Sequence, residues 1–224
     1  IVDGILISVS KDTEERGDYN HFKELISDGI PLVLFDRVID EIDCNKIIVD
    51  DLGGGLLATN YLLDIGCNRI AILTTPDHVS VGLTRKNGYL KALLERNITI
   101  DENLIVKIKE NENITHQIQK LFELKNPPDG IFAVNEIYAA TAIKVAAKNK
   151  LKVPRDLDII GFTDGVISEF SSPSLTTVAQ HGYTMGEKAM ELLLDEIEHP
   201  NPDYPRKTAI INTDLKVRES TKKM

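Results

Sequence analysis

Short apolar runs with no polar alternation inside them recur along the chain. Such a run is typical of a strand buried on both faces of a parallel sheet. Between the runs lie segments whose apolar residues fall on one stripe at helical spacing. The strand-like runs are 4–9, 31–36, 46–49, 69–74, 104–108, 130–134 and 158–162, and the helical segments are 52–63, 82–96, 114–124, 139–147 and 185–197. This alternation predicts an α/β fold with doubly wound parallel sheets built from right-handed βαβ units.

Polar residues and glycines mark the ends of the predicted helices. Asp50 and Asp51 precede the helix 52–63, where a carboxylate can accept hydrogen bonds from the first free N–H groups. Gly66 follows the same helix and is predicted to end it in a left-handed conformation. Asn135 stands between a strand and the next helix, where it is a good N-cap residue.

Two late extended segments interrupt the α/β alternation. One is 175–180, which follows a serine-rich turn, and the other is 208–217, which follows the last helix. Extended segments of this kind can cross between two sheets. They therefore predict two lobes joined by several connections, with a hinge around a cleft.

The charge and the cysteines limit the partners of the chain. The 224 residues carry a net charge of −9, which should repel nucleic acid and anionic membranes. Any DNA contact must then come from residues outside this chain. Cys44 and Cys67 form no recognisable motif, so we expect two buried thiols in a reducing, cytoplasmic compartment. No segment has the run of about 20 apolar residues that a membrane span needs.

Enzyme chemistry is not indicated. The five histidines are scattered without the spacing of a metal site. The glycines 53–55 do not form a phosphate-binding loop, and we expect them to allow close helix packing. No pair of carboxylates suggests a glycoside hydrolase site. We therefore expect no enzyme activity, no cofactor and no metal.

Several sequence blocks occur in an order that resembles a known family, the LacI/GalR (lactose/galactose repressor) transcriptional regulators. The blocks cover nearly the whole chain, and the last ones are the most specific. They are 2–7, 30–37, 51–71, 85–89, 130–135, 153–164, Pro173-Ser174-Leu175-Thr176-Thr177-Val178 and Arg218-Glu219-Ser220-Thr221.

The resemblance implies a periplasmic-binding-protein-like fold of two lobes. The N-terminal lobe would comprise 1–50 and 179–208, and the C-terminal lobe 51–178 and 209–224. The family also has a helix-turn-helix head and two further βα units before the position of Ile1. We therefore expect the N-terminal lobe of this chain to be incomplete and the DNA-reading head to be absent.

Four residues are predicted to bind an effector because they follow strands or open helices at the carboxyl edge of a sheet, where ligands bind in such folds. They are Asp36, Arg85, Asn135 and Asp164. The fork of N–H donors on Arg85 suits vicinal hydroxyls or a carboxylate. The alternative for Asp36 and Asp164 is a turn role, and for Asn135 it is helix capping alone.

Departures from the family pattern leave the effector unidentified. Glu136 stands where the family usually has Asp, and Thr163 replaces the first Asp of a pair, yet both remain candidate effector ligands. The region after 104–108, where many relatives stack an aromatic ring on a sugar, reads Glu110-Asn111-Glu112-Asn113. Stacking could instead come from Phe162, Tyr138 or Phe170, whose alternative role is in the core or a dimer contact.

The resemblance implies a sensing and dimerisation domain. A sugar or sugar derivative would bind between the lobes of a homodimeric repressor and change the affinity of the absent head for operator DNA. The alternative is a periplasmic sugar-binding protein of an ABC transporter, which shares the fold.

Overall fold

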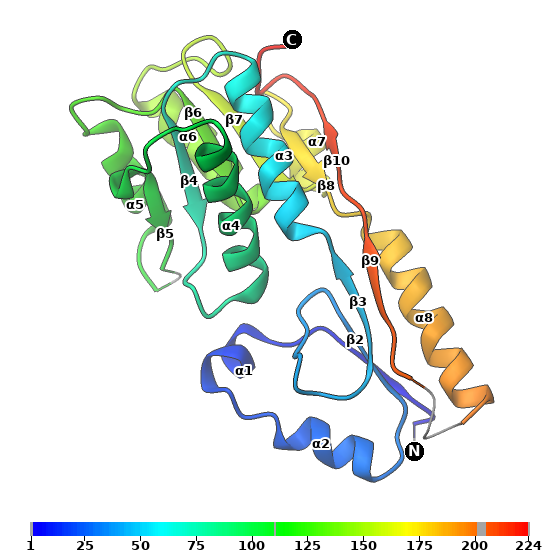
Figure 1. Ribbon diagram of the computed structural model, residues 1–224. Coiled ribbons are helices and arrows are strands. Elements are labelled where there is room, and N and C mark those ends of the chain that lie inside the picture. The colour runs from blue at the N-terminus through cyan, green and yellow to red at the C-terminus, as the bar shows by residue number, and fades with distance from the viewer. Residues whose placement is uncertain (1, 110, 201–204, 224) are drawn as a thin grey trace. The chain divides into compact units, whose positions relative to one another are not determined.

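The computed structural model describes residues 2–109, 111–200 and 205–223, so Glu110 lies outside the described residues. The chain divides into two compact units (Figure 1). The first contains residues 1–50, 78–81 and 181–212, and the second contains residues 51–77, 82–180 and 213–224. Each unit has its own, mainly parallel, sheet, so the predicted α/β fold with two parallel sheets is confirmed.

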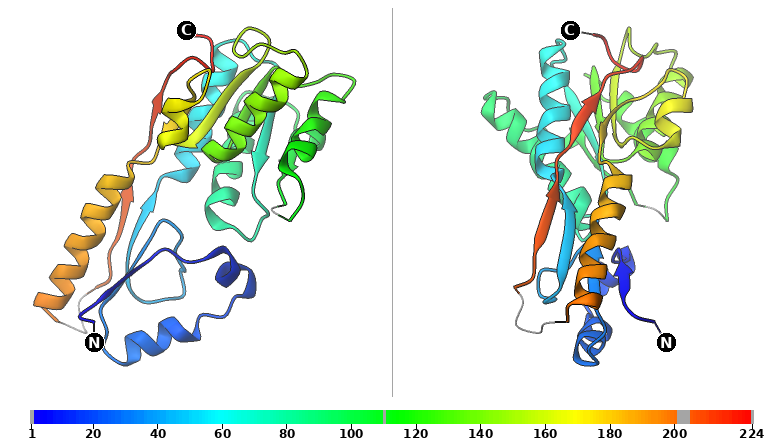
Figure 2. Two further views of the ribbon diagram at one scale, coloured as in Figure 1. Left: turned by 180° about the vertical axis from the view of Figure 1, so that it is seen from behind. Right: turned by 90° about the vertical axis from the view of Figure 1, so that its right-hand side faces the viewer.

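The first unit is built on a four-stranded parallel sheet. The strand order is β1 (Ile5–Ile7), β2 (Leu32–Phe35), β3 (Asn45–Val49) and β9 (Thr208–Ile211). Val33 lies opposite Leu6 on one side and opposite Asn45 on the other. The long helix α8 (Gly182–Glu198) runs along this sheet and packs against β1, β2 and β3 (Figure 2).

The first unit also contains two short helices. Helix α1 (Lys11–Arg16) has no buried residue and depends on its ends, where Ser10 caps the N-terminus and Gly17 adopts a left-handed conformation. Helix α2 (Asn20–Ser27) buries one side chain, Phe22, in a cluster that includes Leu32 and Leu34 of β2. Neither helix was predicted. Helix α1 has no apolar periodicity, and α2 has only three apolar residues at helical spacing within its eight residues.

The second unit has a six-stranded sheet. Its order is β10 (Asp214–Lys216), β8 (Thr176–Ala179), β7 (Asp158–Thr163), β6 (Gly130–Ala133), β4 (Ile70–Thr74) and β5 (Ile105–Lys107), and β10 alone in this sheet is antiparallel to its neighbour. The helices are α3 (Asp51–Asp64), α4 (Ser80–Glu95), α5 (Ile114–Phe122), α6 (Glu136–Lys148) and α7 (Val166–Phe170), with a 3₁₀ turn at Glu102–Leu104. Helices α3 and α6 cover opposite faces of the sheet (Figure 2).

Glycines bring α3 unusually close to its neighbours. A Cβ atom on Gly55 would lie 2.2 Å from the backbone oxygen of Arg85 on α4, and one on Gly54 would lie 2.6 Å from the ring of Phe162. The predicted role of 53–55 in close packing is thus confirmed for these two glycines. Helices α3 and α4 therefore pack through their backbones at Gly55 and Arg85, and a side chain at position 55 would push them apart.

The structure assigns three segments to a different unit from the predicted one, and the first of them is 78–81, which belongs to the first unit. The run 208–217 is two strands, and β9 pairs with β3 in the first sheet whereas β10 pairs with β8 in the second. Residues 209–212 therefore belong to the first unit, although they were predicted in the C-terminal lobe, and residues 179–180 belong to the second. A continuous extended pattern does not reveal the point at which its hydrogen-bond partners change.

Both cysteines are free thiols in the interior, as predicted. Burial raises the pKa of Cys44 to about 11 and, together with the nearby Asp158, that of Cys67 to about 12. None of the helices in the described residues has the length and apolar character needed to cross a membrane.

Candidate functional site

Backbone strain marks two of the strand ends at which effector ligands were predicted. Asp36, after β2, has a φ of 61°, and Thr163 and Asp164, at the end of β7, have φ values of 114° and 62°. Such angles are unfavourable for residues with a Cβ atom, and a β-branched residue such as Thr163 is a clear outlier. Strain of this kind concentrates at ligand-binding sites, where the surrounding structure maintains it.

Arg85 is anchored inside the second unit, with a side chain only 6% exposed. Its Nε donates to Asp51 Oδ1 and its Nη1 to the backbone oxygen of Val134, both at 2.7 Å. Its Nη2 donates to Gln180 Oε1 at 3.2 Å, and its Cζ lies 3.7 Å from the centre of the Phe162 ring. A guanidinium has five N–H donors, so these bonds use three and leave two for a ligand.

Phe162 lies in the core, which is the alternative that the sequence analysis gave beside sugar stacking. The residue is fully buried. The guanidinium of Arg85 lies over its ring, and the ring edge closely approaches Gly54 of α3. Tyr138 is also buried, at 3% exposure, whereas Phe170 is 77% exposed on α7.

Asn135 caps α6, as its position in the sequence predicted. Its Oδ1 accepts a hydrogen bond from the backbone N–H of Tyr138 at 2.9 Å. Its side-chain nitrogen donates to no group in the part of the chain that the structure describes. Capping and ligand binding therefore use different atoms of Asn135, and the structure allows both.

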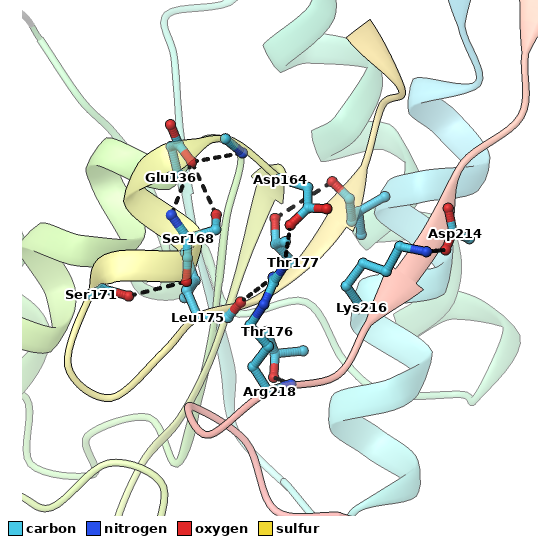
Figure 3. A network of polar contacts seen from close by, with 12 residues as sticks. Glu136, Asp164, Ser168, Ser171, Leu175, Thr176, Thr177, Asp214, Lys216 and Arg218 are labelled. Carbon is cyan, nitrogen blue, oxygen red and sulfur yellow. Dashed lines mark hydrogen bonds and ion pairs between the residues drawn. The ribbon is translucent and has the colours of Figure 1, made fainter. Parts of the chain in front are cut away.

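Glu136 is committed to a second helix terminus. One carboxylate oxygen of Glu136 accepts hydrogen bonds from the backbone N–H groups of Gly165 and Ser168 and from the Ser168 hydroxyl, at 3.0 to 3.2 Å (Figure 3). Gly165 is the N-cap residue of α7 and offers no side chain of its own. Glu136 supplies the missing cap from α6, which ties the start of α7 to the start of α6.

The two most specific sequence blocks of the resemblance, 173–178 and 218–221, contact each other through hydrogen bonds beside Asp164 (Figure 3). Arg218 forms an ion pair with Asp164 Oδ1 at 2.6 Å and donates to the backbone oxygen of Leu175. The Thr176 N–H donates to the Ser220 hydroxyl, and the Thr176 hydroxyl accepts from the Arg218 N–H. The C-terminal segment thus fixes the orientation of Asp164, and the Arg218 ion pair occupies one of its carboxylate oxygens.

Asp36 lies in the first unit, beside Arg37. The two side chains approach to 3.6 Å between Asp36 Oδ2 and Arg37 Nη1, and both remain 22–24% exposed. The Arg37 Nε donates to the backbone oxygen of Val9, after β1. The charge of Asp36 is therefore partly balanced while its carboxylate stays accessible.

The second unit brings together one group of the predicted residues. Arg85 binds Val134, the neighbour of Asn135, and packs on Phe162, the neighbour of Thr163. The sequence analysis missed the contacts of Asp51 and Gln180 with Arg85. Gln180 ends an extended segment, so the strand-end argument used for Asp36 could have identified it.

The cavities of the first unit lie at other residues. One, of about 310 Å³, is lined by Asn45, Leu192, Asp195, Glu196, His199, Arg206 and Lys207. Glu196 is bound there by Asn45 Nδ2 and by Arg206 Nη1, so these groups satisfy one another. Among the described residues no group of three or more His, Cys, Asp or Glu side chains could hold a metal ion.

Comparison with known proteins identifies the family. The model of the periplasmic binding protein-like domain matches residues 59–221. The probable HTH-type transcriptional regulator EndR of Paenibacillus polymyxa is 29% identical and aligns with 100% of this chain and 65% of its own length. The ribose operon repressor of Haemophilus influenzae is 31% identical and aligns with 98% of this chain and 64% of its own length. The chain belongs to the LacI family of transcriptional regulators. Its part in that family is the effector-binding domain.

Solved structures agree with this LacI-family assignment. A LacI-family regulator from Enterococcus faecium with bound ribose superimposes with a TM-score of 0.87 at 25% identity, covering 98% of this chain and 80% of that one. The transcriptional regulator CelR in complex with cellobiose gives 0.84 at 27% identity, with 98% and 66% covered. The resemblance drawn from the sequence is confirmed.

Proposed function

We propose that this domain binds a sugar or sugar derivative and transmits its binding to operator DNA. The DNA contact would be made by a helix-turn-helix head in a homodimeric, cytoplasmic repressor. The chain spans about 65% of the length of the two curated relatives described above. A coupling of about 1–3 kcal/mol would change operator affinity roughly 5- to 150-fold.

The strained strand ends carry the proposal. Of the described non-glycine residues with positive φ, Asn97 and Lys150 follow helices, where such angles end the helix, and His181 is the N-cap residue of α8. Asp36, Thr163 and Asp164 instead follow strands, where no helix terminus requires the angle. Two of these three carry carboxylates, which suit the hydroxyl groups of a sugar.

Polar groups left over by the internal hydrogen bonds support a polyhydroxylated ligand. Arg85 keeps two donors and Asn135 its side-chain nitrogen, and Asp164 has a second carboxylate oxygen. Asp36 offers a partly exposed carboxylate in the first unit. Sugar hydroxyls both donate and accept, so they match this mixture of donors and acceptors.

The relatives point to the same ligand class. The Enterococcus faecium regulator contains ribose, the CelR complex contains cellobiose, and the Haemophilus influenzae relative is a ribose operon repressor. A screen by thermal shift should therefore start with D-ribose and cellobiose and extend to sugar acids, nucleosides and purines. Saturating ligand at 100 times its Kd would stabilise the domain by about 2.7 kcal/mol.

Asn135→Asp tests the site without removing the helix cap. Asp is as good an N-cap as Asn but lacks the N–H donors. The matched control is Asn113→Asp, which makes the same change at the N-cap of α5. By isothermal titration calorimetry, we expect Asn135→Asp to weaken sugar binding at least tenfold and Asn113→Asp to leave it unchanged.

Two results would contradict the proposal. Equal affinity in the wild type and in Asn135→Asp would remove Asn135 from the site. The absence of a thermal shift with every sugar, sugar acid, nucleoside and purine would reject sensing of a small polar effector.

A further inference from the structure

The chain connects its two units at three places besides the short segment 78–81. The connections are Asp50–Asp51, Gln180–His181 and Asn212–Thr213. Each is a single peptide link between the last residue of one unit and the first residue of the other. Any change in the arrangement of the units must be absorbed by backbone torsions near these links and near the two ends of the segment 78–81.

Strand pairing joins two pairs of these connections. In the first unit, β3 and β9 end side by side, with Val49 opposite Ile211, and the Asp50 N–H donates to the Ile211 oxygen at 2.9 Å. In the second unit, β8 and β10 begin their pairing with Ala179 opposite Asp214. The strands that lead to the connections Asp50–Asp51 and Asn212–Thr213 are therefore paired in the first sheet. Those next to the connections Gln180–His181 and Asn212–Thr213 are paired in the second sheet.

A single side chain joins the remaining pair. Asp51 and Gln180 are the residues of the second unit that flank the first and second connections, and both accept hydrogen bonds from the guanidinium of Arg85. The Asp51–Arg85 pair is almost fully buried, and the guanidinium packs against the ring of Phe162. We propose that Arg85 is a hinge anchor, which restrains the first two connections by holding Asp51 and Gln180 together.

Holding the two connections together is a different role from binding an effector. If the proposed function holds, a sugar that binds the two remaining donors of Arg85 would act directly on the group that restrains the connections, and only this consequence rests on the proposed function. The anchor itself exists in the ligand-free protein and is tested there.

Gln180 gives the sharpest test, because Arg85 variants lose a buried ion pair and could fail to fold. Gln180→Met keeps the size of the side chain and removes the acceptor, whereas Gln180→Glu keeps an acceptor and adds a charge that favours Arg85. The matched control is Gln119→Met, which removes a glutamine that exchanges two hydrogen bonds with Asn149 elsewhere in the same unit.

Amide hydrogen exchange of the ligand-free full chain reads out the restraint. We expect Gln180→Met to speed exchange about tenfold in peptides covering 47–54 and 176–184, which contain the two connections. Gln180→Glu should restore the wild-type rates, and Gln119→Met should leave both peptides unchanged. A structural loss without an anchoring role would not be rescued by the glutamate.

Other outcomes overturn the proposal. Wild-type exchange in Gln180→Met, an equal increase in Gln119→Met, or failure of Gln180→Glu to restore the rates would each show that Arg85 does not restrain the connections. Failure of the proposed function appears separately, as the absence of a thermal shift with D-ribose, cellobiose and the other screened ligands.

Discussion

Replacing Arg85 by methionine tests whether the guanidinium belongs to the interior of the second unit. The change removes three hydrogen bonds and leaves Asp51, whose side chain is 8% exposed, without its arginine partner. Removing one partner of a buried ion pair typically costs about 3–5 kcal/mol. Loss of the contact with the Phe162 ring adds about 0.5–2 kcal/mol. We expect Arg85→Met to lower the free energy of unfolding by at least about 3 kcal/mol.

Part of that loss should be recovered when the partner charge is also removed. In the double variant Arg85→Met with Asp51→Leu, no uncompensated carboxylate remains. The backbone oxygen of Val134 still lacks its donor, which costs about 1–3 kcal/mol. We therefore expect the double variant to be more stable than Arg85→Met by about 2 kcal/mol, although still less stable than the wild type.

The measurement is urea unfolding followed by circular dichroism, with amide exchange in β6 assigning the transition to the second unit. Arg96→Met is the matched control, because Arg96 pairs with Asp64 through side chains that are 44% and 42% exposed. Such exposed pairs contribute about 0.2–1 kcal/mol. Equal losses of stability in Arg85→Met and Arg96→Met would refute the assignment of Arg85 to the interior.

Three further predictions concern packing, backbone strain and the thiols. Gly55→Ala should destabilise the second unit by about 1–3 kcal/mol in urea unfolding, because its Cβ would meet the Arg85 backbone. Gly186→Ala on α8, which has open space around it, should instead stabilise the protein by about 0.4–1 kcal/mol. An unchanged free energy of unfolding in Gly55→Ala would contradict the close approach of the two helices. Thr163→Gly should raise the melting temperature in a thermal-shift assay, because it relieves backbone strain of about 1–3 kcal/mol at a φ of 114°. The same change should weaken sugar binding in calorimetry. A lower melting temperature would show that this backbone angle is not strained. Burial raises the pKa of Cys44 to about 11 and that of Cys67 to about 12, so the native protein at pH 8 should resist alkylation by iodoacetamide. The free energy of unfolding should fall as the pH rises from about 9 to 12, because the unfolded chain there loses thiol protons that the native state keeps. Alkylation of the native protein at the rate of the unfolded chain would contradict this prediction.

The strands were predictable because buried parallel strands leave continuous apolar runs. The run 130–134 contains β6 and the run 158–162 contains most of β7. Helix α1 left no such trace, since none of its residues is buried and its stability comes from its two ends. The division of 208–217 between two sheets also left no trace, because an extended segment has the same pattern whichever strand it pairs with.

The candidate site was predictable only as far as local sequence determines it. Asn135 and Asp164 were found because the strand before each is visible in the sequence, and a residue at the carboxyl end of a parallel strand faces the ligand-binding edge of the sheet. The partners of Arg85 were not found, since Asp51 lies 34 residues before it and Gln180 lies 95 residues after it. The burial of Phe162 likewise depends on Gly54, on a helix that is distant in sequence.

A crystal structure of the domain with a sugar that passes the thermal-shift screen tests the central claim most directly. The account predicts ligand density within hydrogen-bond distance of the Asn135 side-chain nitrogen and the Asp164 carboxylate. Density confined to the cavity beside Asn45 and Glu196 in the first unit, with the ends of β6 and β7 empty, would contradict it.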